Sequence, residues 1–270
     1  TLLASSAASD VYKRQIYMIP KVIHYCWFGG NPLPKSAQKC IASWRKYLPD
    51  YEIKEWNESN FDVNIIPYTA EAYKVRKYAF VSDYARFWIL YKYGGLYFDT
   101  DVEVIKNMDE IIAKGPFMGC ENEAKTGATP AQLGVNPGLG LGVNPGLGLY
   151  GEILDIYKDK HYILPDGTYS RETVVTITTD LLCKYGLKNI SDIQEVASVL
   201  IYPKEYFCPK DYATGRLELT ANSASIHHYD ASWLPWYVLM EHKLCYQLHL
   251  PCKDVLNKLF YTKSFWKNHF

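Results

Sequence analysis

Two carboxylates stand one residue apart in the stretch GGLYFDTD, residues 94–101, behind an apolar run and a pair of glycines. Asp99 and Asp101 could hold a divalent cation, because a metal ion bound to a diphosphate commonly takes one or two protein carboxylates and several phosphate oxygens. They could also supply a phosphoryl-transfer nucleophile, begin a calcium loop, or end a strand without any chemistry. The triplet alone does not choose between these four possibilities.

Two of the four possibilities fit the neighbouring residues poorly. A calcium loop that begins at Asp99 would need glycine at its sixth position, where Val104 stands. A phosphatase motif of the DxDx(T/V) type would carry threonine or valine at its fifth position, where Glu103 stands. That motif also usually lies on the first strand of its domain, and here it follows a long stretch of chain. A third alternative is that the two carboxylates help to bind a nucleotide sugar, and the residues upstream support it.

An acidic and a basic residue lie about one helical turn apart upstream of this pair. Residues 69–93 show helical periodicity, and we expect a helix from about 81 to 93 that ends at the glycine pair. Asp83 and Arg86 are three residues apart on this helix, so they share one of its faces. The spacing predicts that the two side chains act together, either on a ligand or as a structural ion pair.

The elements that position these residues alternate between strand and helix. The sequence predicts a strand over 21–30, a helix over 36–51 with its N-cap at Ser36, and a second strand over 51–57. A further strand begins in LYFDTDVEVI, with the acidic pair at or just past its carboxyl end. Open α/β sheets bind ligands outside the carboxyl ends of their strands. This order predicts the start of a parallel sheet.

The second half of the chain contains an unchanged repeat. LGVNPGLG occurs at 133–140 and again at 141–148, and glycine and proline at this density predict a shaped loop. Asn136 in the first copy is expected either to contact a ligand or to form a turn before proline. The other elements expected are helices over 151–160 and 171–186, a strand and turn over 199–209, and a short strand within 223–233.

Composition limits the classes of function. The 270 residues carry a formal net charge of zero, which gives no support to nucleic-acid binding. The seven cysteines show neither a CxxC pair nor zinc-site spacing, so we expect reduced thiols in a cytoplasmic protein. No uninterrupted apolar run is long enough to predict a transmembrane helix.

The chain is expected to contain one catalytic domain, over residues 18–240. Residues 1–17 resemble a translated adapter sequence and are expected to be a non-native leader. Residues 241–270 are expected to form a helical tail that is both basic and aromatic. Such a mixture can lie at a membrane surface, so peripheral contact through 254–270 is one hypothesis, and a terminal helix packed on the domain is the other.

Three blocks carry a resemblance to a known family: IPKVIHYCWFGG, SDYARFWILYKYGGLYFDTD and IHHYDASW, spread over about residues 19–233. Through them the sequence resembles the DxD-containing glycosyltransferases of family 32, of the bacterial capsular-polysaccharide type, and more distantly the clostridial glucosylating toxins. The resemblance implies a single GT-A-like α/β domain, in which a Rossmann-type mixed sheet is flanked by helices. It also implies a metal-dependent transferase that retains the configuration of the transferred hexose.

The resemblance implies which residues hold the metal ion. Asp99 and Asp101 match the motif that holds Mn²⁺ or Mg²⁺ against the donor diphosphate, and Asp101 is favoured for direct contact. His227 matches a third metal ligand near the C-terminus. His228 and Asp230 are possible substitutes for it.

The resemblance also implies which residues hold the donor. Asp83 and Arg86 match residues that grip the transferred sugar, so we expect them to be catalytic together with Asp99 and Asp101. The nucleotide would meet an aromatic residue beside it, another that stacks on its base, and a pair that closes over its diphosphate. These residues are Tyr97, Trp27, and Ser232 with Trp233. Asn136 is added to the donor-binding residues, as a contact to the sugar or the acceptor.

These roles predict the transfer of a hexose from a nucleotide sugar, with UDP-hexose favoured over GDP-mannose. The expected acceptor is a glycan or a lipid-linked saccharide in capsular or other cell-surface polysaccharide synthesis. The expected location is the cytoplasm or the inner face of the cell membrane. Two other classes stay open, namely a DxD-type metal-dependent phosphotransferase and a carbohydrate-binding protein without turnover.

Overall fold

The structure is a computed structural model, and it describes residues 18–212, 214–230, 240–241 and 244. The expected leader over 1–17 lies outside the described residues, as does nearly all of the expected tail over 241–270. Within the described part of the chain, no helix is both long and apolar enough to cross a membrane.

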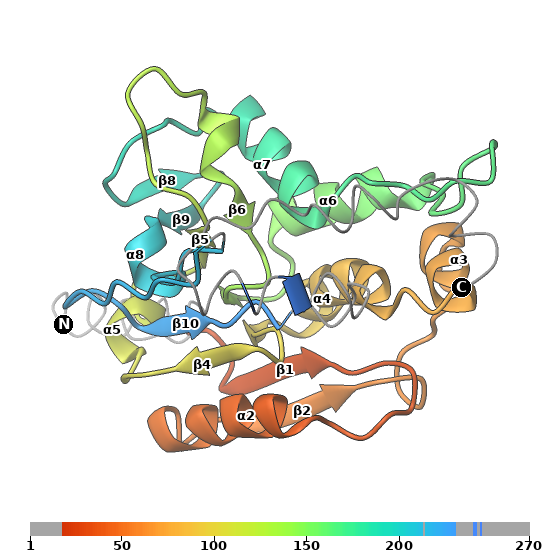
Figure 1. The fold of residues 1–270 in the computed structure, drawn as a ribbon, viewed down its shortest axis with the longest axis horizontal. Helices are drawn as coiled ribbons and strands as arrows, with labels where there is room; N and C mark the ends of the chain where they lie inside the picture. The colour runs from red at the N-terminus through yellow and green to blue at the C-terminus, as the bar shows by residue number, and fades with distance from the viewer. Residues whose placement is uncertain (1–17, 213, 231–239, 242–243, 245–270) are drawn as a thin grey trace, which may run out of the picture.

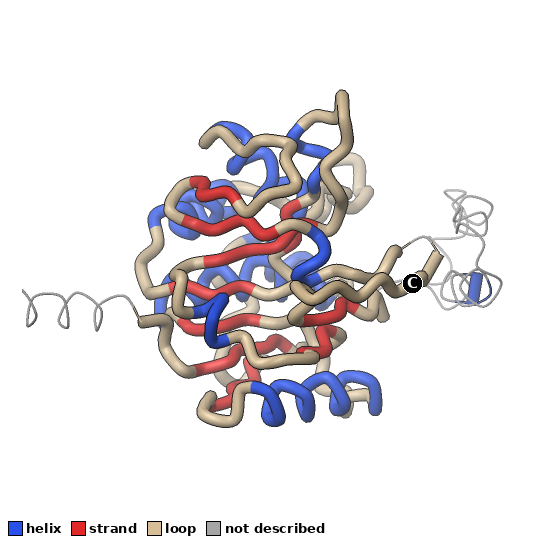
Figure 2. Tube along the Cα trace, turned by 90° about the vertical axis from the view of Figure 1, so that its left-hand side faces the viewer, coloured by secondary structure: helices blue, strands red, loops and turns tan. Residues whose placement is uncertain are grey.

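The described chain forms a large mixed sheet and a small second sheet (Figures 1 and 2). In the large sheet the strands follow the order β2-β1-β3-β7-β5-β9-β8, and β6 pairs with β5. Strand β1 is parallel to β2 and β3, and β5 is parallel to β9, whereas β7 is antiparallel to both of its neighbours. The strands are β1 (Val22–Cys26), β2 (Glu52–Trp56), β3 (Gly95–Tyr97), β4 (Val102–Val104), β5 (Phe117–Cys120), β6 (Val135–Asn136), β7 (Leu141–Val143), β8 (Gln194–Val196), β9 (Val199–Tyr202) and β10 (Ser225–His227).

Helices cover both faces of the large sheet, which confirms the expected α/β architecture. Two separate hydrophobic clusters lie on its two sides, one with α3, α4, α6 and α7 and the other with α2, α5 and α8. Figure 1 shows α2 beside β1 and β2, and α6 beside α4. The helices are α2 (Lys35–Tyr47), α3 (Pro67–Lys74), α4 (Tyr78–Tyr93), α5 (Asp109–Ile112), α6 (Gly148–Lys158), α7 (Val174–Lys184), α8 (Lys204–Phe207) and a 3₁₀ turn, η1 (Pro130–Leu133).

Strand β1 shows how the sequence serves both faces of the sheet. Successive side chains of a strand point to opposite faces. Ile23 and Tyr25 lie in the cluster with α2, while Cys26 lies in the cluster with α4. A strand buried on both sides is expected to be apolar nearly throughout, and VIHYC meets that expectation with one exception, His24.

The stretch LYFDTDVEVI contains two short strands in different sheets, β3 before the acidic pair and β4 after it. Phe98 still donates its backbone N–H to His24, but the N–H of Asp99 turns away and donates to Gly138 at 3.2 Å. After this turn β4 pairs with β10 in the second sheet. The acidic pair therefore lies just past the carboxyl end of β3, as expected, because the ladder to β1 ends at Phe98.

Two local predictions needed correction. Helix α2 begins at Lys35 after an N-cap at Pro34, not at Ser36, and it ends at Tyr47, four residues before the expected boundary. The repeated octapeptide is not only loop, since its first copy supplies β6 and its second copy supplies β7. Both copies are held by strand pairing to β5, which a local reading of glycine and proline does not reveal.

Candidate metal and sugar-nucleotide site

The acidic pair lies in a tight turn that joins the two sheets. The turn is closed by a hydrogen bond from the backbone N–H of Val102 to the carbonyl of Asp99, at 3.0 Å. Asp99 follows β3, which pairs in parallel with β1, and Asp101 comes directly before β4. Both carboxylates are thus held by strands that are anchored in the core.

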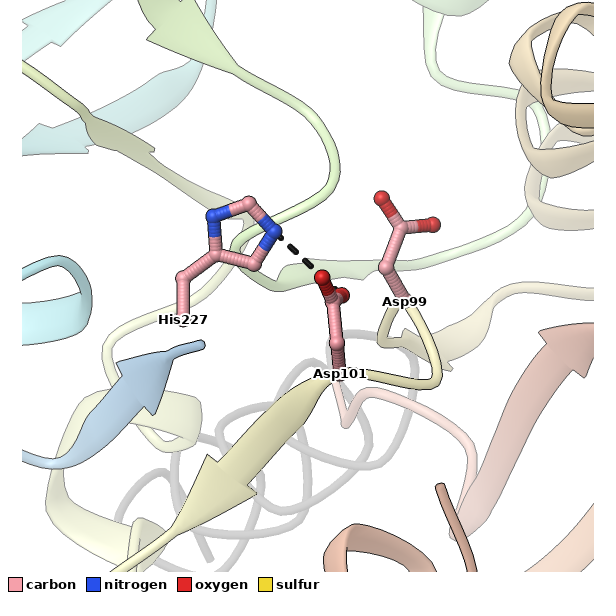
Figure 3. A group of neighbouring side chains, drawn as sticks. All are labelled: Asp99, Asp101 and His227. Carbon is pink, nitrogen blue, oxygen red and sulfur yellow. Dashed lines mark ion pairs between the residues drawn. The ribbon is translucent and has the colours of Figure 1, made fainter. Parts of the chain in front are cut away.

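The second sheet brings a histidine from the far end of the chain to Asp101. In the antiparallel pair of β10 and β4, His227 is opposite Val102. Its Nε2 lies 3.3 Å from Oδ1 of Asp101. The backbone N–H of Asp230 donates to the other carboxylate oxygen at 3.0 Å. Figure 3 shows Asp99, Asp101 and His227 projecting to the same side of the turn.

Asp99 also faces the residues of helix α4. The guanidinium of Arg86 lies 3.3 Å from Oδ1 of Asp99 and 2.9 Å from Oδ1 of Asp83. The hydroxyl of Tyr97 donates to Asp99 at 3.0 Å, and the Tyr97 ring lies 5.0 Å from the Arg86 guanidinium carbon. The structure therefore brings four of the predicted site residues into one contact network.

Helix α4 positions its ion pair because it is apolar on almost every side. Eight of its residues are buried, and Asp83 and Arg86 are the charged ones among them. The side chain of Arg86 is only 4 % exposed. The helix ends at Gly94, which has φ 64°, and Gly95 follows with φ 101°. A Cβ at Gly95 would lie 2.6 Å from the Val22 carbonyl, so the glycine pair allows β3 to pair closely with β1.

Burial separates the protonation behaviour of the three carboxylates. Burial raises the pKa of Asp83 to about 7, although the Arg86 guanidinium opposes the shift. It also raises the pKa of Asp99, again against the effect of Arg86. For Asp101 burial is outweighed by the charge and hydrogen bond of His227, which lower its pKa to about 2. Asp101 is therefore the carboxylate most firmly held as an anion.

His227 responds in the opposite direction to Asp101. Burial alone would lower the pKa of His227, but the Asp101 carboxylate outweighs it and raises that pKa well above the usual value. Protonated His227 thus carries the positive charge that balances the carboxylates of Asp99 and Asp101. A bound cation would provide the same charge and displace the proton, since a metal-binding imidazole must be neutral.

The three side chains fit a divalent metal ion. One ligand atom from each of Asp99, Asp101 and His227 lies within 4.8 Å of the others. Carboxylate oxygens suit Mg²⁺ and Mn²⁺, and one imidazole nitrogen is compatible with Mn²⁺. The arrangement can therefore hold one cation through protein ligands and leave positions for oxygens of a diphosphate.

Among the remaining predicted site residues, Asn136 lies near the cluster but bonds to other groups. The side chain of Asn136 is engaged with Glu121 and with the backbone of Gly138. The indole N–H of Trp27 donates to the carbonyl of Asn31 at 2.6 Å, a contact that does not involve the cluster. Ser232 and Trp233 lie outside the described residues.

The two suggested substitutes for His227 make different contacts. The Nε2 of His228 lies 2.8 Å from Glu103, which pairs the ring away from the acidic turn. Asp230 approaches Asp101 through its backbone N–H and not through its carboxylate. Within the described residues, His227 is thus the member of this group whose side chain completes the cluster.

Sequence reasoning missed two residues beside the site. Glu121 directly follows β5 at the carboxyl end of that strand, and it lies near enough to His227 for their charges to interact. Gly138 lies against Asp99, and a Cβ there would stand 2.1 Å from Oδ2 of Asp99. The rule that pointed to Asp99, an acidic residue after an apolar strand, would also have pointed to Glu121.

The structure is a mixed α/β domain with a cluster of two aspartates and a histidine, which could hold a metal ion, at the turn after β3. Residues 34–118 match the family described as "Glycosyltransferase sugar-binding region containing DXD motif". This segment includes α4, β3 and the acidic turn, while His227 lies beyond it. The match therefore covers Asp83, Arg86, Asp99 and Asp101 but not His227.

Curated relatives agree with this match over part of their length. The chain is 33% identical over 116 residues to inositol phosphoceramide mannosyltransferase 3 of Schizosaccharomyces pombe, covering 38% of this chain and 31% of the relative. It is 30% identical over 130 residues to inositol phosphoceramide mannosyltransferase 1 of the same yeast, covering 44% of this chain and 39% of the relative. The chain thus matches well under half the length of these relatives. The matches support a glycosyltransferase family, and membership of family 32 stays a prediction.

Two solved structures show a more distant likeness. PaToxG glycosyltransferase aligns with 68% of this chain and 79% of its own, at 17% identity and a TM-score of 0.43. A glycosyltransferase involved in the glycosylation of the major capsid of PBCV-1 aligns with 85% of this chain and 100% of its own, at 11% identity and a TM-score of 0.41.

Proposed function

We propose that this protein is a metal-dependent glycosyltransferase that moves a hexose from a nucleotide sugar to a glycan or lipid-linked acceptor. The observation that carries the proposal is the convergence of Asp99, Asp101 and His227, with ligand atoms within 4.8 Å of one another. The buried pair of Asp83 and Arg86 lies directly beside it. The match of residues 34–118 to a DXD sugar-binding region supports the same activity.

The proposed reaction breaks the bond between the anomeric carbon and the donor diphosphate. Negative charge then grows on the leaving group, and a divalent ion held by Asp99, Asp101 and His227 would stabilise it as a Lewis acid. Arg86 is held between two carboxylates, so its remaining N–H groups are preorganised to donate to the sugar or the phosphate. Asp83 would accept hydrogen bonds from sugar hydroxyls and favour the positive charge that develops at the anomeric carbon.

We further propose that transfer retains the configuration of the hexose through a front-face displacement. The nucleotide and the sugar are proposed to be held by Tyr97, Trp27, Asn136, Ser232 and Trp233. UDP-hexoses are the first donors to test. The yeast relatives are named as mannosyltransferases of inositol phosphoceramide. These names also support testing a mannose donor and a lipid acceptor.

The proposed cellular role is the synthesis of a capsular or other cell-surface polysaccharide. This role places the protein in the cytoplasm or on the inner face of the membrane, with residues 254–270 as the proposed contact. Flotation with liposomes tests the contact, because a protein truncated before residue 254 should float less than the full chain.

A donor screen tests the proposed activity. We expect Mn²⁺ together with one of UDP-glucose, UDP-galactose or GDP-mannose to raise the melting temperature, because a ligand that binds only the native state stabilises it by mass action. The same donor should release its nucleoside diphosphate when Mn²⁺ is present. Phosphate release from a simple ester would favour the phosphotransferase class. Donor binding without any release, even with acceptors added, would favour a binding protein.

A further inference from the structure

Glu121 is a carboxylate at the edge of the site that the proposed reaction does not use. Its backbone N–H donates to Gly134 at 2.9 Å, which continues the pairing of β5 with β6 and fixes the residue in place. Burial raises the pKa of this carboxyl, although Asn136 and His227 oppose the shift. Among the described residues, no ion pair is formed by Glu121, and its hydrogen-bond partner is the side chain of Asn136.

Three hydrogen bonds in series connect Glu121 to the acidic turn. The Nδ2 of Asn136 donates to Oε2 of Glu121 at 2.9 Å. The backbone N–H of Gly138 donates to Oδ1 of Asn136 at 2.7 Å. The backbone N–H of Asp99 donates to the carbonyl of Gly138 at 3.2 Å. A carboxylate only accepts and a backbone N–H only donates, so these partners fix which end of the Asn136 amide faces each of them.

Gly138 is also in close contact with the side chain of Asp99. A Cβ at Gly138 would lie 2.1 Å from Oδ2 of Asp99 and 3.1 Å from Oδ1 of Asn136. The Asp99 carboxylate therefore lies against bare backbone, and any shift of residue 138 moves a proposed metal ligand. The position of that backbone depends in turn on the side chain of Asn136.

We propose that Glu121 and Asn136 are a positioning pair that holds Gly138 against Asp99 and thereby sets the affinity of the site for its divalent ion. This inference rests on the proposed metal-dependent function. Residues that orient metal ligands from outside typically change metal affinity by about 10- to 100-fold when they are mutated. The hydrogen bond of the pair is assisted by the charge of the carboxylate, which makes it stronger than a bond between neutral groups.

Exchanging the amide and the carboxylate between positions 136 and 121 tests the proposed positioning pair. The Kd for Mn²⁺ would be measured by calorimetry on the full chain at pH 8, without donor. Glu121→Gln keeps an acceptor for Asn136, so its Kd should stay within about threefold of wild type. Asn136→Asp places two carboxylates face to face and should weaken Mn²⁺ binding by about tenfold or more. The double variant Glu121→Gln, Asn136→Asp lets the glutamine donate to the aspartate, and its Kd should return to within about threefold of wild type.

The sign of the effect separates positioning from simple attraction between charges. Asn136→Asp adds a negative charge beside a cation site, so charge alone would tighten Mn²⁺ binding, while Glu121→Gln would weaken it. The matched control is Asn144→Asp, the same substitution at the equivalent position of the second repeat copy. It should leave the Kd within about threefold of wild type.

A second variant tests the contact with Asp99. Gly138→Ala should weaken Mn²⁺ binding by at least about tenfold because its Cβ overlaps the carboxylate. Gly148→Ala is the matched control, since nothing lies within 4 Å of the added Cβ. Tighter or unchanged Mn²⁺ binding in Asn136→Asp, or a double variant no better than Asn136→Asp alone, would overturn the pair while the proposed function stands. A wild-type protein that binds no Mn²⁺ at all would overturn both.

Discussion

At the scale of single residues, the site is built from charges that are costly to bury. Asp83 and Arg86 are nearly enclosed, and the pKa of Asp83 is raised to about 7 mainly because burial disfavours its anion. Arg86 reduces this cost but does not remove it. Buried groups with perturbed pKa values are common at functional sites. A buried charge there can favour ligand binding even though it disfavours folding.

Replacing Asp83 should therefore stabilise the fold while it impairs the proposed reaction. The folded pKa of Asp83 lies above its unfolded value, so this group disfavours folding increasingly as pH rises from about 4 to 7, at about 1.4 kcal/mol per pKa unit. We expect Asp83→Asn to raise the free energy of unfolding at pH 8 by at least about 1 kcal/mol. At pH 4 the gain should nearly vanish. Urea denaturation at the two pH values measures the difference, and an equal gain at both would contradict this role of burial.

Sequence alone identified most residues of the cluster but not how they are held. The sequence could predict Asp99, Asp101 and Arg86, because each lies in or directly beside an apolar strand or helix that fixes its position. Glu121 follows an apolar strand as Asp99 does, but the sequence does not show its connection to Asp99, which runs through the side chain of Asn136 and the backbone of Gly138. Such a series of contacts depends on tertiary structure and leaves no spacing in the sequence.

At the scale of elements, β1 contains one polar side chain inside the core. His24 is 2 % exposed, and its ring contacts Trp56 of β2 and Gly94, which follows α4. The indole N–H of Trp56 donates to its Nδ1 at 3.1 Å, so the ring proton is on Nε2, which donates to the carbonyl of Gly94 at 3.0 Å. His24 therefore joins β1 to β2 and to the glycine pair that ends α4.

Protonation of His24 should destabilise this junction in acid. Burial lowers its pKa to about 4, so the unfolded chain binds more protons between pH 4 and 6.5 and stability falls as the pH drops through that range. The shift corresponds to about 3 kcal/mol. We expect His24→Gln to be less stable than wild type at pH 7 and to lose less stability between pH 7 and 4. Parallel unfolding curves for the two proteins over this range would show that His24 does not titrate as described.

The elements also show where local patterns are insufficient. The two copies of LGVNPGLG have the same sequence but different backbones, since Gly134 and Gly146 have positive φ whereas Gly142 and Gly138, at the matching positions, do not. Pairing with β5 and β3 decides each conformation. The break between β3 and β4 has the same origin, because it depends on which strand is available to accept each N–H.

At the scale of the whole molecule, the order of elements was the most predictable feature. Alternating strand and helix patterns in the first hundred residues predicted the parallel pairing of β1 with β2, and the structure confirms it. The mixed sheet and the role of His227 were predicted from the family resemblance and not from the strand and helix patterns. The pairing of β10 with β4 that brings His227 to Asp101 is a long-range contact between short strands, and neither strand's sequence predicts its partner.

The central claim is that the cluster of Asp99, Asp101 and His227 holds a divalent ion for hexose transfer. Its most direct test is the Mn²⁺-dependent release of nucleoside diphosphate from the donor that the screen selects, measured for wild type, Asp101→Asn and the control Glu110→Gln. Glu110 is an exposed carboxylate on α5, so its replacement removes one negative charge away from the cluster. We predict that Asp101→Asn stays folded by circular dichroism and loses at least about 100-fold of the release rate, as expected for the loss of transition-state charge stabilisation. Glu110→Gln should match wild type. Undiminished Mn²⁺-dependent release by folded Asp101→Asn would contradict the claim.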